Sequence, residues 1–171
     1  PGAGVGGPCL PINSYQFLNS ASKFDDNLLT IIKASRKRNE SMPLHVIDMI
    51  NEVFNNVGKP LKNSSLLILG VSYKPNVKDI QLSPAKIIIK KLQDQGATVK
   101  IYDPYFKSTS VFGIKIENDL EHALTEVDAV ILLTAHREFL EIKPSFLKST
   151  MKSPIVIDTR GVFDVSAAKE A

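Results

Sequence analysis

The chain has 171 residues, of which 43% are hydrophobic and 23% are charged, and its formal net charge at pH 7 is +3. This length suits one ordinary domain, or one domain with part of another, and the composition is that of a soluble globular protein. Because the net charge is small and the lysines are scattered, nucleic acid is not expected as a partner. The single cysteine excludes an internal disulfide framework, and no apolar run is long enough for a membrane span or a signal segment, so we expect a cytoplasmic protein.

The chain begins with a glycine-rich loop that ends at its only cysteine, Gly2-Ala-Gly4-Val-Gly6-Gly7-Pro8-Cys9. Glycines let backbone N–H groups approach a polar ligand closely. A thiol at the edge of such a loop is a candidate nucleophile, although most free cysteines are simply small buried hydrophobic residues. We interpret the loop as a substrate cradle with Cys9 at its edge.

The same glycines formally match the Gly-x-Gly-x-x-Gly pattern of dinucleotide-binding loops, which must follow a strand and open a helix. Only Pro1 precedes Gly2, and Pro8 and Pro11, which lack a backbone donor, stand where that helix would propagate. The sequence therefore disfavours a dinucleotide site here and predicts that the loop opens no helix. Because the chain starts without Met and directly before a motif, we expect the carboxy-terminal part of a longer protein.

Two helices are expected next. From Asp25 to Asn39 apolar residues recur at helical spacing, with cations in the last turns. From about Ser41 to Val57 a second apolar stripe follows, which Ser41 can cap and Gly58-Lys-Pro60 ends. Because two long helices cannot bury both apolar faces alone, we expect them to pack on further segments or on a second subunit.

After Lys62 short apolar runs alternate with helical patterns. We expect strands at 65–70, 97–102, 128–134 and 155–158, with helices at 83–95, 120–126 and 139–149 between them. This alternation predicts an α/β fold with an open, doubly wound parallel sheet, which binds ligands at the carboxyl ends of its strands. The residues expected at those carboxyl ends are 70–74, Asp103, 134–136 and 158–160.

Four motifs in this order carry a family resemblance. They are the glycine-cysteine loop ending in Pro11, Ser35-Arg36-x-x-Asn39-Glu40-Ser-Met42-Pro43, Leu69-Gly70-Val-Ser-Tyr73-Lys74-Pro75-Asn76, and Asp79-x-x-x-Ser83-Pro84-Ala85. Together they resemble the UDP-glucose/GDP-mannose dehydrogenase family over nearly the whole chain. The middle motifs look more like the UDP-N-acetylmannosamine dehydrogenase branch than the UDP-glucose branch.

The resemblance implies an amino-terminal NAD-binding Rossmann domain, a central helical dimerisation domain and a carboxy-terminal Rossmann-like domain that binds the UDP-sugar. In this chain, residues 1–61 would hold the catalytic cysteine loop and part of the helical dimerisation domain. Residues 62–171 would form the Rossmann-like UDP-sugar-binding domain. NAD would be bound mainly by the missing domain, so we expect the chain alone to be inactive.

The resemblance also implies a reaction, the two-step, four-electron oxidation of a sugar C6 alcohol to the uronate. Cys9 matches the cysteine that captures the aldehyde as a thiohemiacetal and then carries the thioester, a role that suits a strong nucleophile. Asn13 stands where the family usually has an aspartate that helps to activate water. An amide can orient a water molecule but cannot accept its proton at neutral pH.

The remaining site residues are likewise assigned by resemblance. The expected substrate-binding residues are Gly4, Gly6, Gly7, Tyr15, Tyr73, Lys74, Arg160 and His45, the last reaching a neighbouring subunit's substrate. Gln81 replaces an arginine that faces the NAD phosphates, which weakens any cofactor contact. Without the motifs, Lys74 would be read as a solvated lysine, Arg160 as a partner of Asp158, and His45 as a surface residue.

Two other functions stay open. The chain could be a sugar-nucleotide-binding module without catalysis, which the loss of charge at Asn13 and Gln81 favours, or a purely structural dimer formed by the two helices. Cys9 in its glycine loop favours the enzyme. His122 and His136 have no metal-ligand neighbours at suitable spacing, so no metal site is expected.

Overall fold

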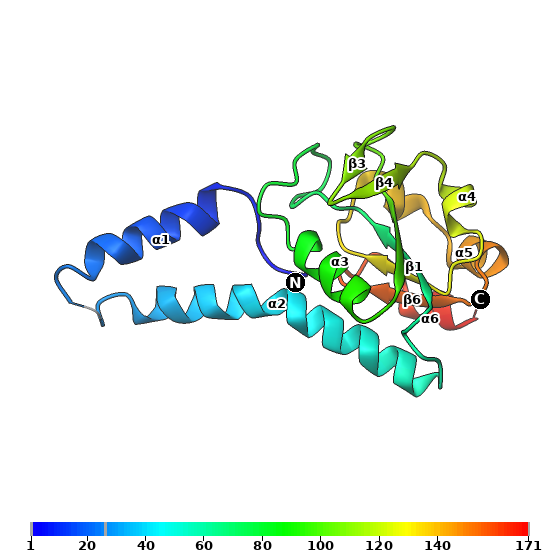
Figure 1. Ribbon diagram of the computed structural model, residues 1–171, viewed down its shortest axis with the longest axis horizontal. Coiled ribbons are helices and arrows are strands. Elements are labelled where there is room, and N and C mark those ends of the chain that lie inside the picture. Colours follow the sequence, from blue (N-terminus) through cyan, green and yellow to red (C-terminus); the bar gives the residue numbers. More distant parts are fainter. Residues whose placement is uncertain (1, 26, 171) are drawn as a thin grey trace.

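The computed structural model describes residues 2–25 and 27–170. In chain order its elements are α1 (Cys9–Ala21), α2 (Thr30–Asn56), β1 (Ser65–Leu69), α3 (Ala85–Asp94), β2 (Thr98–Tyr102), β3 (Ser110–Val111), β4 (Ile114–Glu117), α4 (Leu120–Leu124), β5 (Ala129–Leu132), the 3₁₀ helix η1 (Arg137–Glu141), α5 (Pro144–Thr150), β6 (Ile155–Asp158) and α6 (Val165–Glu170). Helix α1 and the first half of α2 project as an arm from an α/β body (Figure 1). Within the described residues, none of these helices is long and apolar enough to cross a membrane.

The body is built on a six-stranded sheet with the order β3-β4-β2-β1-β5-β6. Every neighbouring pair is parallel except the β3–β4 hairpin. Strand β1 lies in the centre, where Leu66 is paired with Val99 of β2 and with Ala129 of β5. The predicted α/β fold with an open, doubly wound parallel sheet is confirmed.

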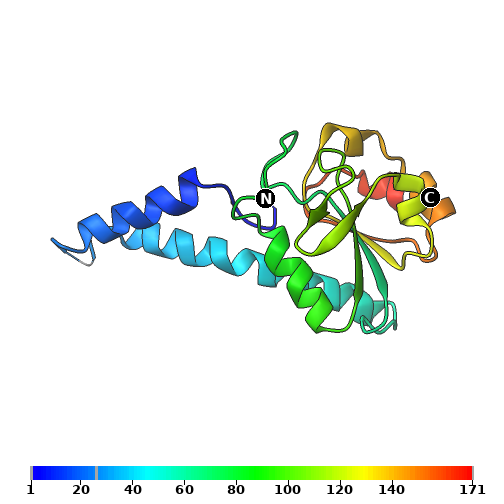
Figure 2. The same cartoon turned by 45° about the horizontal axis from the view of Figure 1, so that its top comes forward.

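Two hydrophobic clusters cover the two faces of this sheet, because successive strand side chains point to opposite faces. Leu66 and Ile68 pack with α2 and α3 on one face, whereas Leu67 and Leu69 pack with α4, η1 and α5 on the other. The second half of α2 lies beside α3 (Figure 2) and buries Ile50 and Phe54. The long helix is therefore part of the core of the body as well as of the arm.

Two helix predictions near the amino terminus are wrong. The glycine loop does open a helix, since α1 begins at Cys9 and holds Pro11 in its first turn, where a backbone N–H has no helical partner in any case. The two expected helices are one, since α2 runs from Thr30 to Asn56 through Pro43. The missing donor at Pro43 leaves the carbonyl of Asn39 without its helical bond, and that oxygen faces Gly4 of the loop.

Further elements differ from the predictions or were not predicted. The helix expected at 139–149 is divided into η1 and α5, and Pro144 starts the second part. The β3–β4 hairpin turns at Phe112 and Gly113, both with positive φ, a conformation that the sequence signals only through the glycine. The carboxy-terminal helix α6 was also missed.

Asp128 links the segment after α2 to the starts of β1 and β5. Its carboxylate lies 2.6 Å from Lys59 Nζ and 3.8 Å from Lys152 Nζ, and it accepts the Ser65 N–H at 2.8 Å. Burial alone would raise the pKa of Asp128. The hydrogen bonds from Lys59 and Ser65, with the charges of the two lysines, outweigh burial and hold this pKa below its ordinary value.

Replacing this carboxylate should give a pH-dependent loss of stability. At pH 7 Asp128→Asn should lower the free energy of unfolding by about 1.5–3 kcal/mol, the usual contribution of a hydrogen bond to a charged group. Because the folded-state pKa lies below the ordinary 3.8, the native chain keeps this stability above that pH and loses it as the pH falls through the lowered value. Urea unfolding from pH 7 down to about pH 2 measures the difference. A difference that stays constant over this range would contradict the assignment.

Candidate active site

The carboxyl ends of β1, β2 and β5 are joined by a buried carboxylate–histidine pair. Asp103 and His136 are both fully buried, with Asp103 Oδ2 at 3.2 Å from His136 Nε2. Asp103 also accepts the backbone N–H groups of Val71 at 2.8 Å and Tyr105 at 2.9 Å, and His136 Nδ1 accepts the Asn76 N–H at 2.9 Å. Three loops thus meet at the edge of the sheet where the sequence predicted a ligand.

The charge of Asp103 is well stabilised there. Burial raises the pKa of the carboxyl group, but the hydrogen bonds from His136, Val71 and Tyr105 outweigh it and place the pKa below its ordinary value. Since Nδ1 of His136 accepts a hydrogen bond, the ring proton is on Nε2 and is donated to Asp103. The pair therefore organises the loops without offering a free group to a substrate.

The loop after β1 presents Tyr73 and Lys74 at this edge. Its backbone is held by the hydroxyl groups of Thr134, which donates to Ser72 O at 2.6 Å, and Ser83, which donates to Val71 O at 2.7 Å. The side chain of Lys74 is exposed. The predicted cation therefore stands at the surface of the loop, open to an anionic ligand.

The glycine loop packs directly on Tyr73. A Cβ atom at Gly6 would lie 2.8 Å from Tyr73 Cβ, and one at Gly7 would lie 2.7 Å from the tyrosine ring. Gly7 also has a φ of 77° and donates its N–H to the Gln81 carbonyl at 2.9 Å. These glycines are expected to contact the substrate, and the structure adds a packing requirement that the sequence does not signal.

The side chain of Asn39 on α2 holds the same loop by two hydrogen bonds to Val5. Its Oδ1 accepts the Val5 N–H at 2.8 Å, and its Nδ2 donates to the Val5 carbonyl at 3.1 Å. An amide side chain suits this role because it offers one acceptor and one donor side by side. Sequence reasoning quoted Asn39 in a motif but assigned it no role.

Cys9 and Asn13 both lie on the exposed side of α1. Cys9 is the first residue of the helix, and Asn13 follows one turn later, so the two side chains share one face. This arrangement leaves the thiol accessible and places an amide next to it. Their catalytic roles stay a prediction.

Tyr15 lies on a different side of α1, in a cleft between the two arm helices. Its hydroxyl donates to Glu40, and the Arg36 guanidinium lies 5.5 Å from the centre of its ring. The hydrogen bond to the Glu40 carboxylate is the main cause that raises the pKa of Tyr15. The cleft has a volume of about 430 Å³ and is also lined by Gly4, Ile12, Pro43, Leu82 and Ile87.

Arg160 lies in a separate, small hollow of about 20 Å³ beside Tyr73 and Gly4. Its Nε is buried without a hydrogen-bond partner among the described residues. The sequence offered Asp158 as an alternative partner of Arg160. The two carboxylate oxygens of Asp158 instead accept the backbone N–H groups of residues 160–163, at 2.6–2.9 Å. Gly4 and Pro84 line both this hollow and the Tyr15 cleft, so the two spaces adjoin.

The other predicted residues lie on the surface. His45 is exposed on α2, and Gln81 is exposed in the loop before α3. His122 is exposed and lies 3.7 Å from Glu117. In the described part of the chain no three His, Cys, Asp or Glu side chains are grouped to hold a metal ion.

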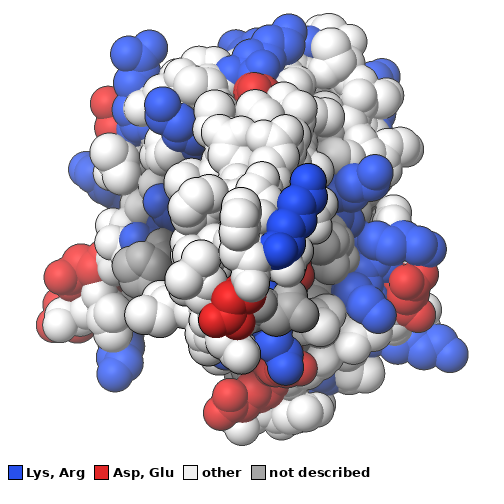
Figure 3. Space-filling view, turned by 90° about the vertical axis from the view of Figure 1, so that its left-hand side faces the viewer, with Lys and Arg blue, Asp and Glu red and all other residues white. Residues whose placement is uncertain are grey.

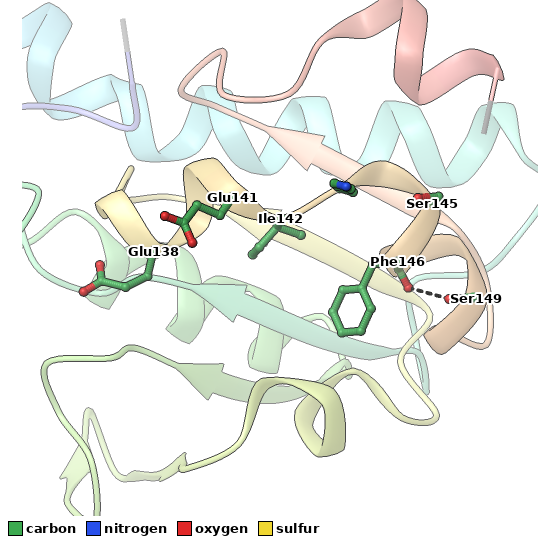
Figure 4. Close-up of a pocket in the computed structure, with 7 residues that line it drawn as sticks. Glu138, Glu141, Ile142, Ser145, Phe146 and Ser149 are labelled. Carbon is green, nitrogen blue, oxygen red and sulfur yellow. Dashed lines mark hydrogen bonds between the residues drawn. The ribbon is translucent and has the colours of Figure 1, made fainter.

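A larger hollow of about 530 Å³ lies between η1 and α5, away from these residues (Figure 4). Glu138 and Glu141 of η1 line it together with Ile142 and Phe146, and Ser149 donates to the Phe146 carbonyl. None of its lining residues belongs to the four motifs. The candidate site is therefore the edge formed by the glycine loop, Tyr73, Lys74 and Arg160.

A sequence model of the UDP-glucose/GDP-mannose dehydrogenase family, UDP binding domain, matches residues 67–165. This match covers more than half of the chain, which therefore belongs to the UDP-glucose/GDP-mannose dehydrogenase family. The resemblance stated from the motifs is confirmed.

Relatives of both branches are similar to the chain. UDP-glucose 6-dehydrogenase TuaD of Bacillus subtilis is 32% identical over 99% of the chain and 37% of its own length. UDP-N-acetyl-D-mannosamine dehydrogenase of Methanocaldococcus jannaschii is 33% identical over 96% of the chain and 36% of its own length. The chain thus spans little more than a third of these relatives.

Solved structures agree with the fold. The UDP-D-ManNAc dehydrogenase of Pyrococcus horikoshii superposes with a TM-score of 0.84 at 29% identity, over 96% of the chain and 37% of that structure. The NDP-N-acetyl-D-galactosaminuronic acid dehydrogenase of Methanosarcina mazei gives a TM-score of 0.90 at 25% identity, over 99% of the chain and 37% of that structure.

The packing of Gly7 on Tyr73 can be tested with a matched glycine. Gly7→Ala should lower the free energy of unfolding by about 1–3 kcal/mol more than Gly58→Ala, because it adds a clash with the Tyr73 ring. Gly58 has a similar φ of 66°, and a Cβ atom added there would meet nothing within 4 Å, so Gly58→Ala carries the backbone cost alone. Urea unfolding of both variants measures the difference, and equal losses would refute the contact.

Proposed function

We propose that the chain is the carboxy-terminal, sugar-nucleotide-binding part of an NAD-dependent UDP-sugar 6-dehydrogenase, with UDP-N-acetylmannosamine or UDP-glucose as substrate. The observation that carries the proposal is the packing of the Cys9 loop on Tyr73, the residue before Lys74. This contact brings the predicted nucleophile and the predicted nucleotide-binding loop into one structural unit. The single cysteine and the composition support a cytoplasmic enzyme.

Cys9 is proposed to act as the nucleophile. Its thiolate would add to the carbonyl carbon of the C6 aldehyde and form a thiohemiacetal, and the thioester formed later would be opened by water. Asn13 shares the exposed face of α1 with Cys9 and could orient that water through its amide. Because an amide cannot take the proton of water, Asn13 is a positioning residue in this scheme.

Lys74 and Arg160 are proposed to bind the diphosphate of the UDP-sugar. A diphosphate needs cationic donors, and both side chains have donors available at the same edge of the sheet. Tyr73 and the glycine loop would then border the sugar. His45, exposed on α2, is proposed to reach the substrate of a neighbouring subunit.

The described residues do not fit a dinucleotide site. The Gly7 N–H is bonded to the Gln81 carbonyl, and the Tyr73 side chain fills the space beside Gly6 and Gly7. Gln81 offers an uncharged amide where a phosphate would need a cation. NAD, which supplies the oxidising power in this reaction, is therefore assigned to the part of the enzyme outside this chain.

A binding module without catalysis is the second candidate. It is favoured by Asn13 and Gln81, which lack the charges that the family usually has at these positions. It predicts the same nucleotide binding but no covalent chemistry at Cys9.

Nucleotide binding is tested by calorimetry with UDP. The chain should bind UDP, and Lys74→Ala should weaken binding by about 1.5–3 kcal/mol, the usual loss for a charged hydrogen bond. Lys91→Ala, on an exposed lysine of α3, should leave the affinity unchanged. A folded chain that fails to bind UDP, or equal losses in the two variants, would count against the pocket.

We also propose that the chain forms a homodimer through its arm. Apolar side chains are exposed on it, with Phe24, Leu28 and Ile31 at 86%, 62% and 81% exposure. Viewed towards its tip, the arm shows a broad uncharged surface with both basic and acidic side chains at its border (Figure 3). Large exposed apolar patches of this kind mark protein–protein contacts.

Light scattering should therefore report twice the monomer mass at a protein concentration of about tens of micromolar, if the dissociation constant of the dimer lies below it. Ile31→Glu should give a monomer, because it buries a charge in the apolar contact. Leu140→Glu, which replaces an exposed leucine of η1 on the body, should remain dimeric. A monomeric native chain with folded helices would refute the dimer.

A further inference from the structure

The loop that carries Lys74 rests on a completely buried histidine. His136 is 0% exposed, and its Nδ1 accepts the backbone N–H of Asn76, two residues beyond Lys74, at 2.9 Å. The opposite ring nitrogen, Nε2, donates to Asp103. His136 therefore uses both nitrogens, one to hold the loop and the other to hold itself in place.

The surroundings of His136 leave it little freedom. The Tyr105 ring lies 4.8 Å from its ring centre, and the Phe139 ring packs edge-on at 5.5 Å. Asp103 is fixed in turn by two backbone N–H groups. A ring held this firmly can define the position of whatever its Nδ1 contacts.

The segment 72–79 behaves as one unit above this ring. Ser72 Oγ donates to the Val77 carbonyl at 2.6 Å, and the Tyr73 N–H donates to the Asp79 carbonyl at 3.1 Å, so the segment closes on itself. Asn76 has a φ of 60°, an uncommon conformation for a residue other than glycine. Its side chain is tied down as well, because Oδ1 accepts the Arg137 N–H at 2.9 Å.

We propose that His136 is a positioning residue of the sugar-nucleotide site, which sets the segment 72–79 through the Asn76 N–H and thereby places both Lys74 and the Cys9 loop. The second effect follows from Tyr73, whose side chain supports Gly6 and Gly7. One buried ring thus couples the nucleotide half of the site to the nucleophile. This inference rests on the proposed function, since it gives His136 a role in the same site.

Two replacements of His136 separate its two hydrogen bonds. Asn places an amide oxygen near the position of Nδ1 and keeps an acceptor for Asn76, whereas Gln reaches towards Asp103 and leaves the Asn76 N–H without its acceptor. His136→Gln should weaken UDP binding about five- to tenfold, the equivalent of one lost hydrogen bond. His136→Asn should stay within about threefold of the native chain. The surface variant His122→Gln is the control.

Two further readouts keep the inference separate from the proposed function. Amide hydrogen exchange at 73–79 and alkylation of Cys9 by iodoacetamide both need no nucleotide, and Cys9 is the only thiol in the chain. In His136→Gln the exchange should rise and the alkylation rate should change several-fold, while His136→Asn should stay near native. A native chain that does not bind UDP would overturn the proposed function but leave these two measurements decisive.

Equal effects of the two replacements on exchange and alkylation would show a purely structural histidine and overturn the proposal. Should either variant fail to fold, the contact can be disturbed from the exposed loop instead. Asn76→Gly keeps the N–H donor and adopts positive φ readily, whereas the β-branched Asn76→Val disfavours it. Asn76→Val should reproduce the rise in exchange and the change in alkylation, and equal behaviour of these two variants would also contradict the role of His136.

Discussion

The close packing of two loops is the constraint on which the site depends. The glycine loop can reach the Tyr73 side chain only because Gly6 and Gly7 carry no Cβ, and Asn39 holds the same loop from α2. Beneath Tyr73, the buried Asp103–His136 pair fixes the segment that bears it. Residues from the arm and from the edge of the sheet are therefore held in one arrangement. Cys9 comes two residues after Gly7, so its position depends on this packing.

The sheet, and the edge at which its loops meet, could be predicted from the sequence. Strands β1 and β5 are short, wholly apolar runs after their first residues, and the residues after the strands, such as Asp103 and His136, are polar in a buried setting. Alternation of such runs with helical patterns fixes a doubly wound parallel sheet and the side on which its loops meet. The family resemblance added the predicted roles of Cys9, Lys74 and Arg160, which no periodicity could supply.

The helical pattern of residues 30–56 could be predicted, but the continuity of α2 and the start of α1 at Cys9 could not, because Pro43 and Pro11 suggested breaks. Pro11 is compatible with a first turn, and Pro43 is tolerated inside α2 where tertiary packing outweighs one lost hydrogen bond. The hydrogen bonds of Asn39 and of His136 could not be predicted either, since each of them joins residues far apart in the sequence. Tyr15 is expected beside the sugar, and this stays a prediction; its hydroxyl is bonded to Glu40 in the cleft that adjoins the Arg160 hollow.

The most direct test of the account is a covalent intermediate at Cys9 in the full-length enzyme. After mixing with NAD⁺ and UDP-N-acetylmannosamine or UDP-glucose, intact-protein mass spectrometry should show an adduct that is absent in Cys9→Ser. Because Asn13 cannot act as a base, Asn13→Asp should shorten the lifetime of the adduct, by up to the ~10²–10⁴-fold that general-base catalysis provides. An enzyme that oxidises the sugar nucleotide without any adduct at Cys9 would contradict the account, and equal lifetimes would show that another group activates the water.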